Sequence, residues 1–231
     1  LYEGLKWCVG SDNLDEKVKA DLNKFEGYMN QLQEAHKKGG DAAFDAKFKE
    51  IFGVDYDPNL ARGYSKLQND YANAYAMTAG LEGFNKEFSS SINGNESYDT
   101  MLQKYGNYLQ SASSSINDGV QAAENGIALA MKKDGIDFKN ATEAQKQQYL
   151  KNILKETQES LNNEIQKYTR GKSLDTMKKD LDQASIAIFG NKGDIVSRVN
   201  NYVASQQQGG AYTAMALKAA GAIALGVLTG G

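Results

Sequence analysis

The chain has very few of the residues that cross-link a fold or carry common side-chain chemistry. Among its 231 residues there are one cysteine, one proline, one histidine and one tryptophan. Cys8 alone can form neither an intrachain disulfide nor a cysteine zinc cluster. His36 has no second histidine to complete a metal site, and no serine or cysteine motif lies beside it in the sequence. A single proline leaves few interruptions, so long helices are expected.

Net charge is also low. The 26 Lys and Arg residues nearly balance the 29 Asp and Glu residues, which gives a formal charge of -3. The basic residues are spread through most of the chain and form no sustained basic stretch for a phosphate backbone, so we predict no nucleic-acid partner.

Two short motifs resemble ligand sites, and both are weak. The segment 190–195, GNKGDI, lacks the preceding strand and the Lys-Ser/Thr ending of a phosphate-binding loop. Asp55 and Asp57 lack the further ligands of a calcium loop, so helix capping explains them better. We therefore predict a protein that is not an enzyme and that holds no cofactor and no metal.

What the sequence does contain is helical periodicity. Apolar residues recur at steps of three and four, and no sustained strand-like alternation occurs. Asp57 before Pro58 predicts a helix start, Asn140 with Glu143 resembles a capping box, and Asn93-Gly94 reads as a turn between helices. The prediction is an all-α, elongated antiparallel helical bundle over residues 1–208. The expected helices cover about 14–38, 42–52, 58–89, 96–133 with a bend at its Ser-rich middle, 140–169, 174–188 and 195–202.

The end of the chain is different in character. Residues 211–228 form an apolar run of eighteen residues broken only by Lys218, in a chain whose mean hydropathy is -0.58. As a helix this run is about 27 Å long, slightly short of a hydrocarbon core of about 30 Å. Its five strongly apolar residues contribute roughly -1.5 to -3 kcal/mol to insertion, and one central lysine costs about +2.5 to +3.5 kcal/mol. Insertion as a lone helix is therefore close to balance.

The many alanines and glycines of the run favour close packing against other helices. We predict a separate apolar C-terminal helix over 209–231, hinged at Gly209 and Gly210; an Ala-rich buried helix that completes a soluble bundle stays as the alternative. The residues predicted to insert into a membrane or into neighbouring subunits are Met215, Leu217, Lys218, Gly221, Ile223, Leu225, Gly226, Val227 and Leu228.

The middle of the chain resembles a known family. Residues 61–125 combine a Gly-containing helix that ends in spaced aromatics with a Tyr-rich helix that has a small-residue middle, and the matching positions are Gly80, Gly83, Phe84, Phe88, Tyr98, Tyr105 and Tyr108. This patterning is similar to the minor pilin family of conjugative type IV secretion systems, of the Trb type. The resemblance implies an exported helical-bundle protein of a pilus tip, without enzymatic activity or cofactor.

Two hypotheses follow for function. The first is a structural or assembly component of a type IV secretion or conjugation apparatus, which forms homo-oligomers and binds other subunits of the apparatus. The second is an α-helical membrane-active protein, such as a pore-forming toxin subunit, a translocator or a phage ejection protein, whose C-terminal helix inserts into a bilayer. Because the chain begins with Leu1 rather than Met, we expect a removed leader and an exported, periplasmic or extracellular, membrane-associated protein.

Overall fold

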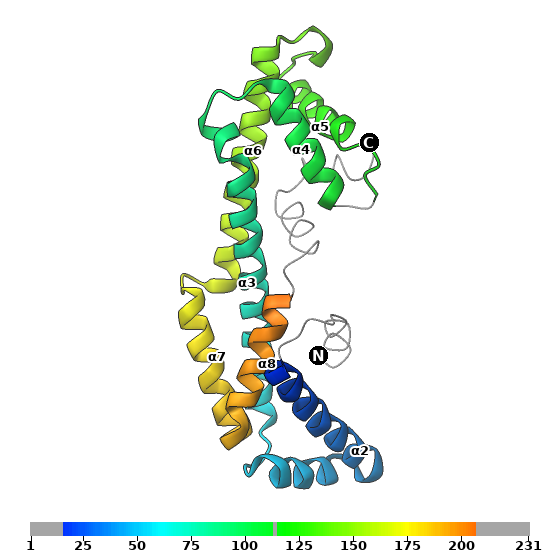
Figure 1. Cartoon of the computed structure of the whole chain (residues 1–231), viewed down its shortest axis with the longest axis vertical. Coiled ribbons are helices and arrows are strands. Elements are labelled where there is room, and N and C mark those ends of the chain that lie inside the picture. Colours follow the sequence, from blue (N-terminus) through cyan, green and yellow to red (C-terminus); the bar gives the residue numbers. More distant parts are fainter. Residues whose placement is uncertain (1–15, 113–114, 207–231) are drawn as a thin grey trace. The chain divides into compact units, whose positions relative to one another are not determined.

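The computed structural model describes residues 16–112 and 115–206, and these residues are all-α (Figure 1). No strand occurs within the described ranges, and the helices pack antiparallel, so the predicted fold class is confirmed to that extent. The elements are α2 (Glu16–Phe52), α3 (Pro58–Asn93), α4 (Tyr98–Ala112), α5 (Gly119–Lys133), η1 (Phe138–Asn140), α6 (Glu143–Thr169), α7 (Leu174–Phe189), η2 (Gly190–Lys192) and α8 (Gly193–Gln206).

Several predictions concern residues outside these ranges. They include Cys8, the hinge Gly209 and Gly210, the apolar C-terminal helix and every residue predicted to insert, from Met215 to Leu228. These stay predictions, as does the division of the chain at residue 208. Among the helices that are described, none has both the length and the apolar character needed to cross a bilayer.

The chain divides into two compact units. Unit 1 comprises 16–75 together with 168–206, and unit 2 comprises 76–167. Helix α3 contributes its first half to unit 1 and its second half to unit 2. Each unit has its own buried residues and is described by itself below.

Unit 1 is built around a bent helix. Gly39 and Gly40 have non-helical backbone angles within α2, and Gly40 has a positive φ of 67°, which favours glycine. The chain folds back at this pair, as the contact between Tyr28, which precedes the bend, and Phe52, which follows it, shows. The predicted break at this glycine pair is confirmed. Helices α7 and α8 complete the unit, with the fully buried Leu181 of α7 in its core.

Helix α8 runs antiparallel to the first arm of α2. Lys192, just before α8, donates a hydrogen bond to the Tyr28 hydroxyl (3.1 Å), and Arg198 pairs with Asp21. A step of six residues along one helix therefore matches seven residues backward along the other. On its other side α8 meets α3, where the buried Asn200 bonds to Gln68 and Tyr64.

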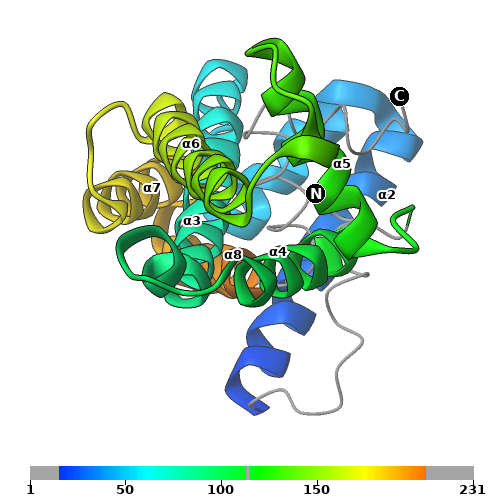
Figure 2. The ribbon, with the colours of Figure 1, turned by 90° about the horizontal axis from the view of Figure 1, so that it is seen from above.

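Unit 2 contains the second half of α3 with α4, α5 and α6. Helices α3 and α6 lie side by side in both ribbon views (Figures 1 and 2), and Gln158 of α6 donates to Asn85 of α3. Aromatic rings fill the interior beside them: Phe84 and Phe88 contact Tyr108 at 5.6 and 5.5 Å between ring centroids. Burial raises the pKa of the Tyr108 phenol and keeps it neutral. Phe84 and Phe88 are therefore core residues of unit 2, and Tyr108 is half-buried beside them.

One predicted helix was wrong. The expected single bent helix over 96–133 is two antiparallel helices, α4 and α5, and Asp118 caps the second by accepting a hydrogen bond from the Gln121 amide. The two helices approach closely at Gly106 and Gly119: a Cβ atom on Gly119 would lie 1.8 Å from the Gly106 carbonyl oxygen. The chain therefore reverses direction between α4 and α5 instead of bending within one helix.

Of the two helix starts predicted from capping residues, one is confirmed and the other is wrong. Asp57 caps α3 by accepting from the Asn59 amide at 2.8 Å, which confirms the start predicted there. The capping box predicted at Asn140 and Glu143 was wrong, because Asn140 belongs to η1. The reciprocal bonds are made two residues later, between Thr142 and Gln145.

Candidate functional site

The structure brings together none of the predicted insertion residues, since all lie outside the described ranges. Within those ranges, no three His, Cys, Asp or Glu side chains gather in a way that could hold a metal ion. The described feature best suited to binding is an apolar pocket in unit 1.

This aromatic pocket lies between the two arms of α2 and has a volume of about 460 Å³, within the range of roughly 300–1,000 Å³ that is usual for binding pockets. The bend at the glycine pair positions its walls, because it turns the aromatic face of the second arm toward the apolar stripe of the first. Its lining residues are Phe25, Met29, Asn30, Leu32, Gln33, His36, Phe44, Phe48, Tyr56 and Phe189.

The walls of the aromatic pocket are held by contacts between rings. Tyr56 meets Phe44 and Phe48 edge to face, with ring centroids 5.0 and 5.1 Å apart. Phe189, at the end of α7, reaches Phe52 at 5.0 Å and closes the pocket from a distant part of the chain. Such ring pairs each contribute about 0.5–1.5 kcal/mol beyond their burial and so hold the walls of the pocket together. Met29 adds a polarizable and flexible side chain to this wall.

A polar mouth adjoins the aromatic pocket. It has a volume of about 410 Å³ and is lined by His36, Asp41, Phe44, Asp45, Tyr56 and Pro58, three of which also line the aromatic pocket. His36 Nε2 lies 3.1 Å from Asp41 Oδ1, and the imidazole is exposed, in keeping with its polar surroundings in the sequence. Among the ion pairs of the described residues Asp45 takes part in none, so the mouth offers exposed acidic groups beside aromatic ones.

A second cavity of about 350 Å³ lies where α8 meets the start of α2, and Asp21 and Arg198 are among the residues that line it. Arg198 donates two hydrogen bonds to the Asp21 carboxylate, at 2.7 and 3.1 Å. These bonds hold the pKa of the Asp21 carboxyl below its usual value, against the opposing effect of burial. The charges are used to fix α8 on α2, so this cavity is structural.

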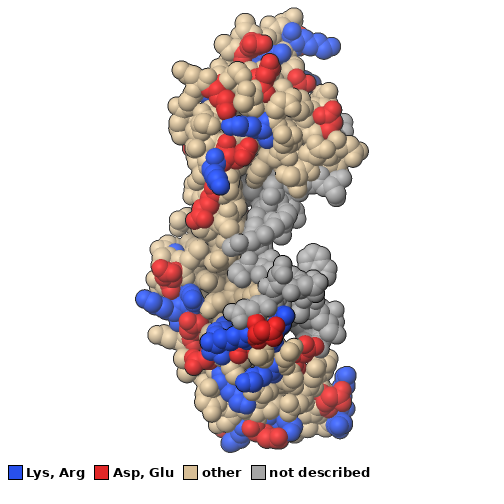
Figure 3. Space-filling model, viewed as in Figure 1, with Lys and Arg blue, Asp and Glu red and all other residues tan. Residues whose placement is uncertain are grey.

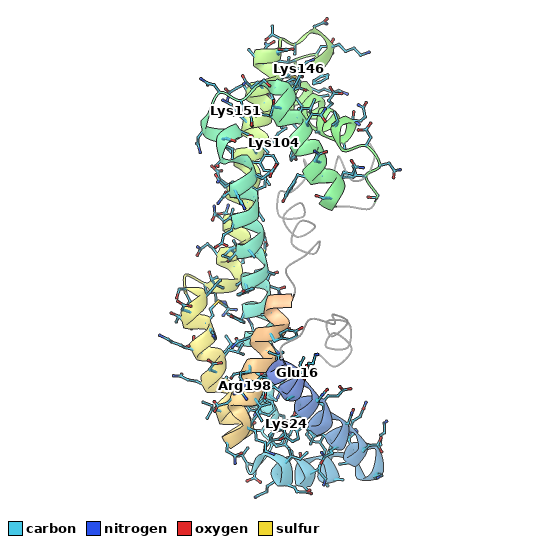
Figure 4. The ribbon with its side chains drawn as sticks, viewed as in Figure 1. Glu16, Lys24, Lys104, Lys146, Lys151 and Arg198 are labelled. Atoms are coloured by element: carbon cyan, nitrogen blue, oxygen red, sulfur yellow. The ribbon has the colours of Figure 1, made fainter. Side chains whose placement is uncertain are left out.

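In unit 2 the charged groups also serve the fold. Lys104 bonds to Glu96 at 2.7 Å, and Lys151 donates to the Gly94 carbonyl at 2.6 Å, which fastens the turn between α3 and α4 (Figure 4). Burial raises the pKa of the Glu96 carboxyl, but the bonds from Lys104 and Ser91 outweigh it and leave the pKa below its usual value. On the face drawn in Figure 3, acidic and basic side chains are interspersed within each unit.

Sequence reasoning missed the aromatic pocket, although it predicted the helices over 14–38 and 42–52 whose side chains line most of it. Phe44, Phe48 and Phe52 recur at a helical spacing, which puts them on one side of a helix. The signal for a pocket was the Gly-Gly pair between two aromatic stripes, but the contribution of Phe189 comes from tertiary contact and has no local signature.

No protein-family model, curated protein or solved structure matches the chain.

Proposed function

We propose that the protein is a non-enzymatic structural component of a multi-subunit export apparatus, of the type IV secretion or conjugation class, that assembles through its helices. The observation that supports this proposal best is the aromatic pocket of unit 1. Its ring-lined interior and acidic mouth suit the side chains of an apolar helix that carries a positive charge. The resemblance of residues 61–125 to minor pilins supplies the apparatus class.

The apolar run of the sequence begins five residues after α8 ends at Gln206. In the proposed function this run is the assembly element, which neighbouring subunits cover. Burial in protein suits it better than a lone insertion into lipid, since Lys218 offsets most of the apolar gain there.

The test compares the 231-residue chain with a chain that ends at Gly209, which keeps every described residue. Sedimentation and negative-stain electron microscopy should show that the full chain forms oligomers and the shortened chain does not. If both chains stay monomeric at every concentration, or both assemble equally, the proposal is wrong.

A second candidate function is a membrane-active helical protein, and the position of the apolar run favours it. The run follows a packed helix through the pair Gly209 and Gly210, so release from a covering surface would free it for lipid. Dye release from liposomes, measured for the same two chains, tests this function. Leakage caused only by the full chain supports it, and equal or absent leakage excludes it.

A further inference from the structure

We propose that the aromatic pocket of one copy of this chain binds the apolar run 211–228 of a second copy, with Lys218 of that run beside Asp41 and Asp45. The inference rests on the proposed function, because it assigns a partner and a binding surface to the same assembly element. The contact is heterologous, since one copy contributes its apolar run and the other contributes its aromatic pocket. Repetition of such a contact joins copies head to tail, into a ring where the rotation closes and into an open filament where it does not.

The shape of the run suits the aromatic pocket. In a helix each residue advances by about 100°, so Leu217, Leu225 and Leu228 share one face about 80° wide, with Gly221 between them. The absence of a side chain at Gly221 permits close approach. From Leu217 to Leu228 this face is about 16 Å long at 1.5 Å per residue. The first arm of α2 lines the pocket from 25 to 36, which is the same number of helical steps.

The charges are also complementary. Lys218 is the one ionisable residue of the run apart from Tyr212, and it adjoins the leucine face. An ammonium group in apolar surroundings is costly to desolvate unless a carboxylate pairs with it. Asp41 and Asp45 supply carboxylates at the mouth, and the aromatic rings there can also receive a cation. When Lys218 lies at the mouth, Leu217 lies near His36, and the rest of the run extends along the pocket toward Phe25.

The geometry of unit 1 favours a run from another copy over the run of the same chain. Because α8 is antiparallel to α2, its last residue Gln206 lies about 12 Å beyond the level of Asp21, on the side away from the mouth. From Asp21 to His36 is a further 22 Å or so along α2. The total distance to cover is roughly 34 Å.

The reach of the same chain is shorter. From Gln206 to the start of the run, fully extended, is about 17 Å, and the helix from there to Lys218 adds about 10 Å. The sum of about 27 Å falls short of the roughly 34 Å that separates Gln206 from the mouth. The Lys218 side chain could cover the difference only if every linker residue were fully extended and the chain used none of its length to reverse direction. A second copy has no such constraint.

The experiment is a charge exchange in the full chain, followed by analytical ultracentrifugation over a range of concentrations. Lys218→Asp places an acid beside the acidic mouth, and Asp41→Lys with Asp45→Lys places bases beside Lys218. Each variant should self-associate at least about tenfold more weakly than the natural chain. Asp175→Lys, an exposed acid of α7 outside the pocket residues, is the matched control and should assemble normally.

The decisive sample is the mixture of the two defective variants. In it, each run meets a mouth of opposite charge on the other variant, so assembly should return, which misfolding or pairing within one chain cannot produce. Circular dichroism of each variant verifies the helical fold. The inference is overturned if either variant assembles like the natural chain or if the mixture associates no better than its components. If assembly requires the run but ignores these charges, the inference fails and the proposed function stands; if the natural chain never assembles, both fail.

Discussion

The close approach of α4 and α5 gives a prediction whose size can be worked from the structure. The change is Gly119→Ala. The added Cβ would lie 1.8 Å from the carbonyl oxygen of Gly106 and 2.6 Å from its carbonyl carbon, whereas real Cβ contacts essentially never fall below 3.0 Å. Both clashing atoms belong to the backbone, so no side-chain rotation relieves the contact. The helices must separate locally by at least 1.2 Å to bring the oxygen contact from 1.8 Å to 3.0 Å.

Separation of this kind is costly because fully buried residues, among them Leu109 and Ile127, belong to the two helices. Overpacking of a close contact typically costs about 1–3 kcal/mol, and the weaker apolar packing between the separated helices adds to this cost. The better helix propensity of alanine returns up to about 1 kcal/mol. We expect the free energy of unfolding to fall by about 2 kcal/mol or more, with the melting temperature lower by about 4–8 °C.

The assay is urea unfolding followed by far-ultraviolet circular dichroism, with Gly83→Ala as the matched control. Gly83 lies in α3 within unit 2, and a Cβ there would meet nothing within 4 Å. The free energy of unfolding of that control should rise by about 0.5–1 kcal/mol, because alanine loses less backbone entropy than glycine when a helix forms. If the two variants show equal stability, the close approach of α4 and α5 is refuted.

Three further predictions concern stability. Asp21→Asn should lower the free energy of unfolding by about 1–2 kcal/mol at pH 7, since Arg198 is partly solvated. The difference from the natural chain should shrink as the pH falls below 3.8, because a carboxyl with a lowered folded-state pKa stabilises the fold only while it is ionised. A difference in urea titrations that does not change with pH would contradict this. Leu181→Ala should lower the free energy of unfolding by about 2–5 kcal/mol, because Leu181 is fully buried. Leu129 is 44% exposed, so Leu129→Ala should change it by less than about 0.5 kcal/mol. Similar melting temperatures for the two variants would disprove the assigned core. Thr142→Ala should cost about 1 kcal/mol through loss of the capping box, measured as a lower urea midpoint, and an unchanged midpoint would argue against the box.

Local features of the fold could be predicted because their causes are local. Asp57 and Pro58 determine the start of α3 through one side-chain bond and one missing amide, and both are visible in the sequence. The break in α2 follows from two adjacent glycines, of which Gly40 takes a positive φ. The capping box at Thr142 was missed because a more N-terminal Asn-Glu pair had the same spacing.

Long-range arrangement could not be predicted in the same way. The separation of α4 from α5 depends on a backbone contact between Gly106 and Gly119, and periodicity continues through the intervening turn as if one helix were present. The aromatic pocket likewise depends on Phe189, which lies more than a hundred residues from Tyr56. Helical spacing says which face of a helix is apolar, but not which partner covers that face.

The sequence by itself determined the helical class, most helix boundaries and the apolar character of residues 211–228, because these follow from side-chain type and spacing along one segment. Only the tertiary structure decided that the bent α2 folds its aromatic faces around a pocket, that acidic residues line the mouth and that α8 directs the chain away from it. The physical reason is that burial is a property of pairs of surfaces. A stripe on one helix becomes core, pocket or docking surface only according to what the rest of the chain, or another copy, places against it.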